Sequence, residues 1–169
     1  LWRVLRSNGG LPKEAIVCFA NTGKEMEETL RFVRDCGNEW GVPITWLEYR
    51  NDEIGYTVVD FDSASRNGEP FEAIIRKRGY PPNPVARFCT VELKIQTMHK
   101  YLRELGWDEW DEMVGIRADE QRRLVKVRAN PSGGKRGVER SVPLADAGIT
   151  VMDVSAFWRS QPFDLELPN

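Results

Sequence analysis

The chain has 169 residues, of which 41% are hydrophobic and 30% charged, and its formal net charge is −2. These values are ordinary for one globular domain, and they exclude binding to nucleic acid or to an anionic membrane through bulk positive charge. The cysteines, Cys18, Cys36 and Cys89, have no C-x-x-C spacing, so neither a disulfide framework nor a zinc or iron–sulfur site is indicated. No apolar stretch approaches the ~18 residues of a membrane span. We therefore expect a single cytoplasmic domain over residues 1–169 that has no contact with a membrane.

The chain begins inside a predicted helix. Residues 1–8 (LWRVLRSN) carry four apolar side chains at helical spacing, and Gly9-Gly10 is expected to end the helix. Because neither an initiating Met nor a capping residue precedes it, we expect further residues upstream.

A strand, a helix and a second strand follow. Residues 15–20 (AIVCFA) are a short apolar run, typical of a parallel strand buried on both faces. Residues 24–40 repeat apolar side chains at mostly helical spacing, and Gly41-Val42-Pro43 ends that helix. Residues 44–49 (ITWLEY) predict the next strand. Together these segments predict a βαβ unit.

The rest of the chain alternates between further predicted elements. In order, they are a short strand over 56–61, a loop over 63–70, a helix over 71–78, a proline-rich break over 79–84, an amphipathic helix over 90–105, a parallel strand over 112–116, a glycine- and charge-rich loop over 129–140, and a last helix over 150–160 capped by Thr150 or Asp153. Internal repeats and low-complexity tracts are absent from the sequence.

The junction after the first strand, within IVCFANTGKEMEETLRFV (16–33), is a candidate anion site. Gly23-Lys24 has the look of the end of a Walker A loop, but that pattern requires Gly where Cys18 stands and Ser or Thr where Glu25 stands. A loop that leads from a strand into a helix nevertheless presents free backbone N–H groups to an anion. The alternative is that Asn21-Thr22 only caps the helix.

Residues 132–135 (SGGK) copy the start of a pyrophosphate loop of the S-G-G-K-D-S type. That loop needs a strand before it, a final hydroxyl residue and a helix after it. Here Pro131 precedes the segment, Gly137 replaces the final Ser, and Pro143 with Gly148 prevents a long helix. We therefore interpret 132–135 as a flexible loop.

Basic side chains form a further candidate site. They are Arg87, Lys94, Arg117, Arg122 and Arg123. If the two segments that carry them converge on one crevice of a doubly wound sheet, their cations suit phosphate or sulfate oxygens; a solvated charged face is the alternative. The run 117–140 holds eight Lys/Arg against three Asp/Glu, which could also meet nucleic acid, although it lacks interleaved aromatic residues.

Four other side chains have two interpretations each. Cys89 is a candidate nucleophile, because the neighbouring cations and a helix N-terminus would lower its pKa, or else a small packing residue. His99 lies within an amphipathic helix, which favours a structural or surface role. Asp60 and Asp62 alternate on a predicted strand and could hold Mg²⁺, but a solvated strand edge explains them as well.

Four segments together resemble the phosphoadenosine phosphosulfate (PAPS) reductase family, within the adenine-nucleotide alpha-hydrolase-like group. The matching segments are Asn21-Thr22-Gly23 with Glu28-Thr29, similar to D-T-G-x-x-x-x-E-T with Asn in place of Asp; residues 87–94 (RFCTVELK), a Cys-containing segment that ends in Lys; Gly115-Ile116-Arg117 through Arg122; and, more loosely, Pro143-Leu144-Ala145 with Asp153-Val154. The ordered set spans about residues 15–160. Its nearest likeness is to bacteriophage-encoded members, for which the host cytoplasm is the expected location.

The resemblance implies a Rossmann-like, three-layer α/β/α fold with a mainly parallel sheet that binds an adenine nucleotide: ATP, adenosine phosphosulfate (APS) or PAPS. It assigns nucleotide binding to Asn21, Thr22, Gly23, Glu28 and Thr29, catalysis to Lys94, Arg117 and Cys89, and anion binding to Arg87, Arg122 and Arg123. Mg²⁺ is a candidate cofactor, and a thioredoxin-like reductant is a candidate partner.

The chain also departs from the family. The first strand with its pyrophosphate loop and the C-terminal Cys segment are missing, since no cysteine follows Cys89. In a reductase of the family that distal thiol attacks the sulfonyl sulfur, and thioredoxin resolves the resulting thiosulfonate. We therefore expect a domain truncated at both ends, from an enzyme of sulfonucleotide reduction or a related nucleotide-dependent sulfur transfer or adenylation. The alternatives are a phage protein that modifies or binds nucleic acid on the same fold, and an inactive nucleotide-binding interaction module.

Overall fold

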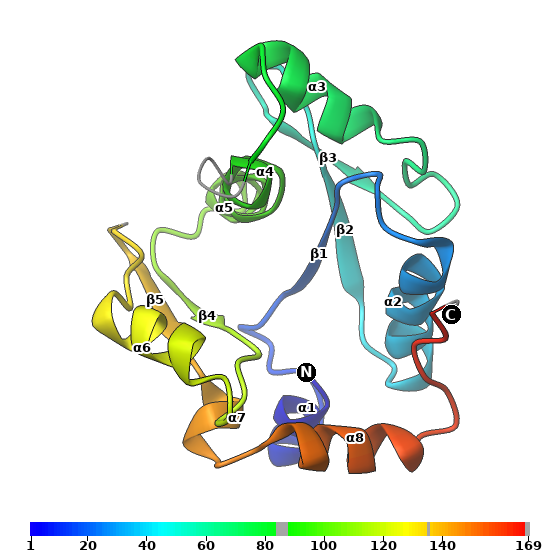
Figure 1. The fold of residues 1–169 in the computed structure, drawn as a ribbon, viewed down its shortest axis with the longest axis vertical. Coiled ribbons are helices and arrows are strands. Elements are labelled where there is room, and N and C mark those ends of the chain that lie inside the picture. The colour runs from blue at the N-terminus through cyan, green and yellow to red at the C-terminus, as the bar shows by residue number, and fades with distance from the viewer. Residues whose placement is uncertain (84–87, 135, 168–169) are drawn as a thin grey trace. The chain divides into compact units, whose positions relative to one another are not determined.

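The computed structural model describes residues 1–83, 88–134 and 136–167 (Figure 1). The chain is a mixed α/β protein with two small sheets, so the α/β class is confirmed. It divides into two compact units. Unit 1 is residues 1–104 with the C-terminal segment from Leu165, and unit 2 is residues 105–164. Within the described residues, no helix has the length and the apolar character needed to cross a membrane.

The predicted βαβ unit is confirmed in unit 1. Strand β1 (Val17–Asn21) leads through a loop into helix α2 (Glu27–Glu39), which returns the chain to strand β2 (Ile44–Tyr49). The two strands pair in parallel, with Asn21 opposite Glu48 at their carboxyl ends. Helix α2 begins three residues later than predicted, because residues 22–25 form a turn in which the Glu25 side chain accepts the Thr22 N–H.

Three further elements complete this end of unit 1. Helix α1 (Trp2–Asn8) ends at Gly9 as predicted. Strand β3 (Tyr56–Val59) pairs antiparallel with β2, so the three-stranded sheet, in the order β1-β2-β3, is mixed. Helix α3 (Glu69–Arg78) begins two residues before its predicted start. Pro70 lies in its first turn, where a backbone N–H has no partner within the helix and its absence in proline costs nothing.

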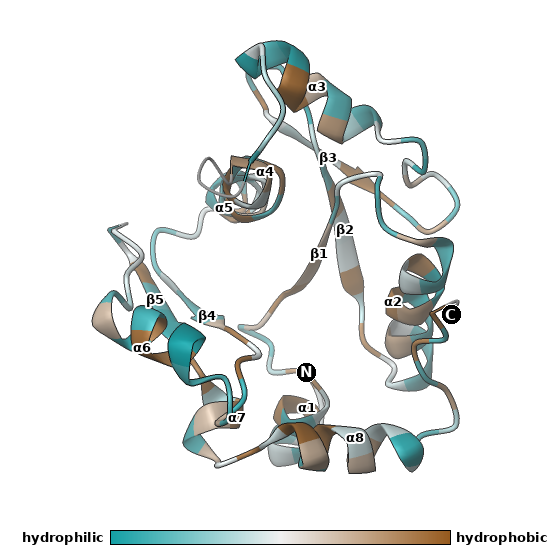
Figure 2. Ribbon diagram, in the orientation of Figure 1, coloured by the Kyte–Doolittle hydropathy of each residue, from teal (hydrophilic) through white to brown (hydrophobic). Residues whose placement is uncertain are grey.

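Helices cover both faces of this sheet. On one face, Leu30 of α2 packs against Trp46 of β2 and Ala64. On the other face, a second cluster surrounds Tyr49 of β2, and its buried members are Tyr49, Ile74, Phe88 and Leu93. This alternation follows from the two-residue period of a strand. Hydrophobic colour accordingly runs along β1 (Figure 2).

The predicted helix over 90–105 has three parts. Helix α4 (Phe88–Thr90) precedes a π-helical segment, η1 (Val91–Gln96), and helix α5 (Thr97–Glu104) follows. The Thr97 hydroxyl donates to the Glu92 carbonyl at 2.8 Å, five residues earlier. π-Helical turns are rare in proteins, and those that occur are frequently found at functional sites. Here the π segment carries Lys94.

Unit 2 contains a second strand–helix–strand arrangement. Strand β4 (Trp110–Met113) is followed by α6 (Gln121–Ala129) and β5 (Val138–Ser141), and the two strands pair in parallel. The predicted strand over 112–116 therefore lies two residues too late. The predicted loop over 129–140 was wrong at its end, because β5 begins there, and α6 was not predicted.

The C-terminal half of unit 2 is helical. Helix α7 (Pro143–Asp146) was not predicted, whereas α8 (Val151–Arg159) agrees with the predicted last helix. Thr150 is the N-cap and forms a reciprocal capping box with Asp153 at position N3, so the first of the two proposed caps is confirmed. The small core of this unit consists of Ile116, Leu124 and Val142, with Val114, Val127 and Ala145 around them.

Candidate functional site

Asn21 ends β1 and holds the loop that follows. Its side chain is fully buried. The carboxamide oxygen accepts the Gly23 N–H at 3.0 Å, and the nitrogen donates to Glu48 Oε1 at 2.6 Å and to the Ser65 carbonyl at 2.8 Å. Asn21 therefore supports the loop from the inside, and its assignment to nucleotide binding stays a prediction.

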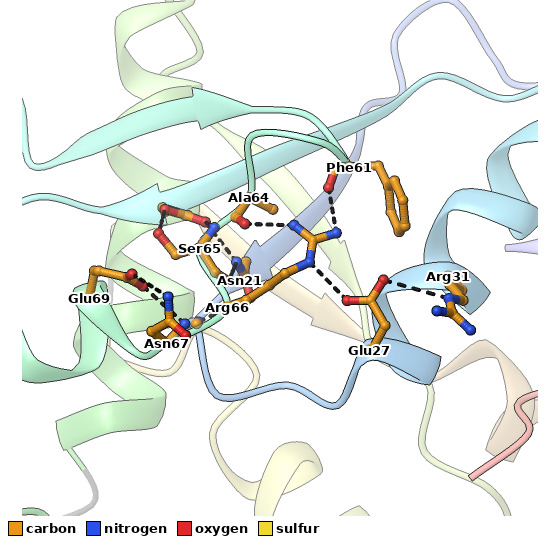
Figure 3. A network of polar contacts seen from close by, with 11 residues as sticks. Asn21, Glu27, Arg31, Phe61, Ala64, Ser65, Arg66, Asn67 and Glu69 are labelled. Atoms are coloured by element: carbon orange, nitrogen blue, oxygen red, sulfur yellow. Dashed lines mark hydrogen bonds and ion pairs between the residues drawn. The ribbon is translucent and has the colours of Figure 1, made fainter.

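Glu48 is the buried acid behind this arrangement. Only 5% of the residue is exposed, and its carboxylate accepts hydrogen bonds from Asn21 Nδ2, from the Ser65 N–H at 2.6 Å and from the Ser65 hydroxyl at 2.7 Å. Figure 3 shows the network around Asn21 and Ser65. An aspartate at position 21, as in the family pattern, would set a second carboxylate against Glu48. The Asn in this chain is thus explained by its partner.

Arg66 fastens the neighbouring loop to helix α2. Its guanidinium donates to the Ala64 and Phe61 carbonyls and to Glu27 Oε2, each at 2.8 Å (Figure 3). The hydrogen bond from Arg66 is the main reason that the pKa of Glu27 lies below its usual value. The loop after β3 is thereby tied to the first residue of α2.

Gly23 lets two loops approach closely. Its φ of +74° is in the left-handed region, and an added Cβ would lie 3.0 Å from Gly68 Cα and from Pro70 Cδ. The next residue, Lys24, donates from Nζ to the Asn67 carbonyl at 2.8 Å. The ammonium of Lys24 is thus bonded to the loop at the start of α3.

Lys94 meets this loop from a distant part of the sequence. Its ammonium lies 3.1 Å from Glu25 Oε1, although the residues are 69 positions apart. The other carboxylate oxygen of Glu25 accepts the Thr22 N–H at 2.8 Å and the Thr22 hydroxyl at 2.7 Å. Burial alone would raise the pKa of Glu25, but the hydrogen bonds from Thr22 and the charge of Lys94 outweigh it, so this pKa is lowered. The structure thereby brings two of the predicted motif segments together.

The π-helical segment determines how Lys94 reaches the loop. Glu92 is buried and pairs with Arg78 of α3, while Leu93 is fully buried in the core cluster. Both neighbours anchor the segment, so the backbone of Lys94 is held in place while 42% of its side chain remains exposed.

The other predicted residues of unit 1 that the structure describes do not join this cluster. Glu28 and Thr29 lie half-buried in the first turn of α2. Cys89 packs against the cluster around Leu93, in accordance with its packing interpretation. Arg87 lies outside the described residues. Burial raises the pKa of the Cys18 thiol, and that of Cys36, to about 11, so both remain protonated near neutrality.

The candidate metal and histidine positions have local roles. Strand β3 ends at Val59, so Asp60 and Asp62 do not share a strand; instead Asp60 accepts the Ser63 N–H and hydroxyl in a turn, and these bonds lower its pKa. In the described part of the chain, no group of three His, Cys, Asp or Glu residues is arranged to hold a metal ion. His99 is buried on α5, as its structural interpretation expects.

The arginines of unit 2 are largely paired with acids. Glu120 accepts from Arg123 and lies 3.6 Å from Arg117, which also bonds to Asp119 at 3.0 Å. Arg122 is exposed on α6. These residues belong to unit 2 and Lys94 to unit 1, so the convergence of the two basic segments stays a prediction.

The SGGK segment behaves as a loop where it is described. Gly133 and Gly134 have positive φ values, and the Ser132 hydroxyl accepts the Gly134 N–H at 3.2 Å. Lys135 lies outside the described residues. The chain continues into strand β5 rather than into a helix, so no helix N-terminus follows the segment as a pyrophosphate loop requires.

A cavity of about 390 Å³ lies at the carboxyl end of β2, beside the Asn21 network. Glu48, Tyr49, Ser65 and Pro70 line part of its wall. The network that holds the Asn21 loop is therefore also one side of an open space at the strand ends. Sequence reasoning missed Glu25, Glu48 and Ser65; the available signal was a single acid inside the otherwise apolar strand ITWLEY.

Comparison with known proteins finds a relative in a bacteriophage. The chain is 34% identical over 166 residues to the uncharacterized nin region protein ORF290 of Escherichia phage lambda, in an alignment that covers 93% of this chain and 53% of that protein. It thus spans about half the length of the curated relative. No family model and no solved structure matches the chain. The relative is a phage protein, in agreement with the phage likeness of the motifs, and its name states no activity.

Proposed function

We propose that unit 1 binds the phosphate or sulfate end of an adenine nucleotide at the carboxyl end of β1. The chain would then be a PAPS-reductase-like domain with a Rossmann-like three-layer fold. The whole protein would act in sulfonucleotide reduction or in a related nucleotide-dependent sulfur transfer or adenylation.

The observation that carries the proposal is the ion pair between Lys94 and Glu25. It joins the Asn21-Thr22-Gly23 segment to the segment that ends in Lys94, and both belong to the motif set of the family. The Lys94 ammonium, the Thr22 N–H and the Thr22 hydroxyl therefore all donate to the one carboxylate of Glu25, next to the end of strand β1. Strand ends in α/β sheets are the usual place for ligands, and charge-assisted hydrogen bonds are the usual means of holding an oxyanion.

Helix α2 adds a favourable field. It has 13 residues and begins at Glu27, directly after this loop. The partial positive charge at a helix N-terminus favours a nearby anion by ~0.3–1 kcal/mol. The carboxylates of Glu27 and Glu28 in the first turn offset part of this positive charge. Helix α2 therefore adds to the attraction between Lys94 and an anion and does not replace it.

The cysteines of this chain favour a binding role over thiol attack. Cys18 and Cys36 have pKa values of about 11, and Cys89 packs against the core. A thiol must ionise before it attacks a sulfonyl sulfur. We therefore assign nucleotide binding to this chain and leave any thiol step to a residue outside it.

Calorimetric titration with ATP, APS and PAPS tests the proposal. The wild-type chain is expected to bind at least one of them, and Lys94→Gln should weaken that binding about tenfold or more, because one charge-assisted contact is lost. Lys13→Gln is the matched control: it removes one exposed lysine of the same unit, located before β1. If none of the three nucleotides binds, or if both variants bind alike, the proposal is wrong.

Titration with single-stranded DNA tests the alternative of polynucleotide binding. Arg122 and Lys126, which are exposed one turn apart on α6, are the candidate phosphate contacts. Arg123 and Arg128 of this helix are paired with acids. Binding to single-stranded DNA should weaken steeply as salt rises, whereas a single-nucleotide site should change little. Steep salt dependence together with no nucleotide binding would favour the nucleic-acid alternative.

A further inference from the structure

The carboxylate of Glu25 occupies the donor set that a bound oxyanion would use. It receives the Thr22 N–H at 2.8 Å, the Thr22 hydroxyl at 2.7 Å and the Lys94 ammonium at 3.1 Å. A backbone N–H, a hydroxyl and an ammonium are donors typical of phosphate and sulfate sites. We call these three groups the Thr22–Lys94 receptor.

Every hydrogen bond of the Glu25 carboxylate in the described structure goes to this receptor. The side chain is 12% exposed, whereas that of Lys94 is 42% exposed, so the receptor is open to solvent on the lysine side. Two anions in contact with a single ammonium repel one another at short range. An incoming sulfate therefore cannot use the receptor while Glu25 remains in it.

Glu25 is placed so that it can leave without damage to the fold. It lies in the loop between β1 and α2, outside both elements. Its neighbours in the chain, Lys24 and Met26, are exposed. Rotation of the Glu25 side chain would bring its carboxylate into water while Leu30 and the core beneath α2 stay packed.

We propose that Glu25 is an internal anion that closes the Thr22–Lys94 receptor in the empty protein and is displaced by the phosphate or sulfate end of the nucleotide. This inference rests on the proposed nucleotide site. It makes Glu25 a determinant of selectivity, because only an anionic group can replace it at Lys94. A neutral nucleoside gains nothing from its displacement.

Titration with inorganic sulfate and with PAPS, at constant ionic strength, tests this inference. Glu25→Gln can still accept the Thr22 N–H but carries no charge, so its affinity for both ligands should rise about tenfold. Glu72→Gln is the matched control, because it removes one exposed carboxylate of the same unit on α3 and should change affinity less than about twofold. Adding Lys94→Gln to Glu25→Gln should abolish the gain. Glu25→Ala should change affinity in the same direction, and circular dichroism checks that each variant is folded.

The outcomes separate this inference from the proposed function. If wild type binds PAPS and Glu25→Gln binds it equally or more weakly, Glu25 is no competitor and only this inference is wrong. If Glu25→Gln binds sulfate more tightly while no protein binds an adenine nucleotide, the receptor stands and the nucleotide assignment is wrong. If Glu25→Gln binds sulfate no better than wild type does, the displacement model is overturned whatever PAPS does.

Discussion

The replacement Asn21→Asp is the strongest test of how the loop after β1 is held. It introduces the aspartate of the PAPS reductase pattern but removes both N–H donors of the Asn21 carboxamide. The hydrogen bond to Glu48 is short, buried and made to a charged group, and a second goes to the Ser65 carbonyl. Loss of these two bonds should lower the free energy of unfolding by about 2–4 kcal/mol.

The new carboxylate adds a pH dependence. Two carboxylates at hydrogen-bond distance cannot both stay ionised, so the folded variant holds one shared proton at pH values at which the unfolded carboxyls, with pKa values of about 4, have already released theirs. Folding is then linked to proton uptake, and the loss of stability relative to wild type should shrink as the pH falls. Urea unfolding of wild type and variant between about pH 5 and pH 8 measures both the loss of stability and its dependence on pH.

Two further variants make this test specific. Asn51→Asp is the matched control: the exposed Asn51 uses its side-chain oxygen to accept from the Tyr49 hydroxyl, which an aspartate does as well, so its stability should change little. Glu48→Gln combined with Asn21→Asp removes the repulsion between two carboxylates and should recover part of the loss. A cost for Asn21→Asp below about 1 kcal/mol, or no recovery in the double variant, would refute the argument from the buried pair.

Two other predictions concern the same loop. Gly23→Ala should destabilise the protein more than Gly79→Ala does. Both glycines have positive φ, but only at Gly23 would the added Cβ lie 3.0 Å from the backbone of another loop. In urea unfolding, the free energy of unfolding should fall by about 1–2 kcal/mol for Gly79→Ala, from the backbone conformation alone, and by more for Gly23→Ala. Equal losses would mean that the contact with the neighbouring loop is easily relieved. Glu25 has a lowered pKa in the folded protein relative to its ordinary value of 4.5, so the stability that it contributes is present above about pH 4.5 and is lost as the pH falls through the lower, folded value. Acid unfolding curves of wild type should therefore be steeper in this region than those of Glu25→Gln, and superimposable curves would contradict the assignment.

Local patterns predicted the first half of the fold well. The bounds of β2 agree with the predicted strand, and β1 and α2 agree within a few residues, because an apolar run and a helical repeat are properties of adjacent residues. Helix α6 was missed since its sequence, QRRLVKVRA, buries only Leu124, and Val125 is 64% exposed. A helix with one buried residue gives no clear apolar stripe.

Other features depend on partners far away in the sequence. Strand β5 has only four residues, VERS, and its Arg140 pairs with Glu112 across the sheet at 2.9 Å, 28 residues earlier. In the π-helical segment, Glu92 likewise pairs with Arg78 of α3. Such contacts arise from tertiary packing, which a periodicity within one segment does not contain.

The candidate site divides between adjacent residues of one motif. Asn21 is fully buried and bonds to Glu48 and Ser65, so it supports the fold, whereas Thr22 and Lys94 hold the carboxylate of Glu25 beside solvent. A spacing pattern in the sequence cannot separate these two roles, because a residue can occupy a fixed motif position either to support the fold or to bind a ligand. The structure makes the division measurable: Asn21→Asp should change stability with little direct effect on anion affinity once folded, and Lys94→Gln should change anion affinity with little effect on stability, since Lys94 is a half-exposed partner of one carboxylate. The opposite pattern would mean that the buried network of Asn21 and Glu48, rather than the Thr22–Lys94 receptor, meets the ligand.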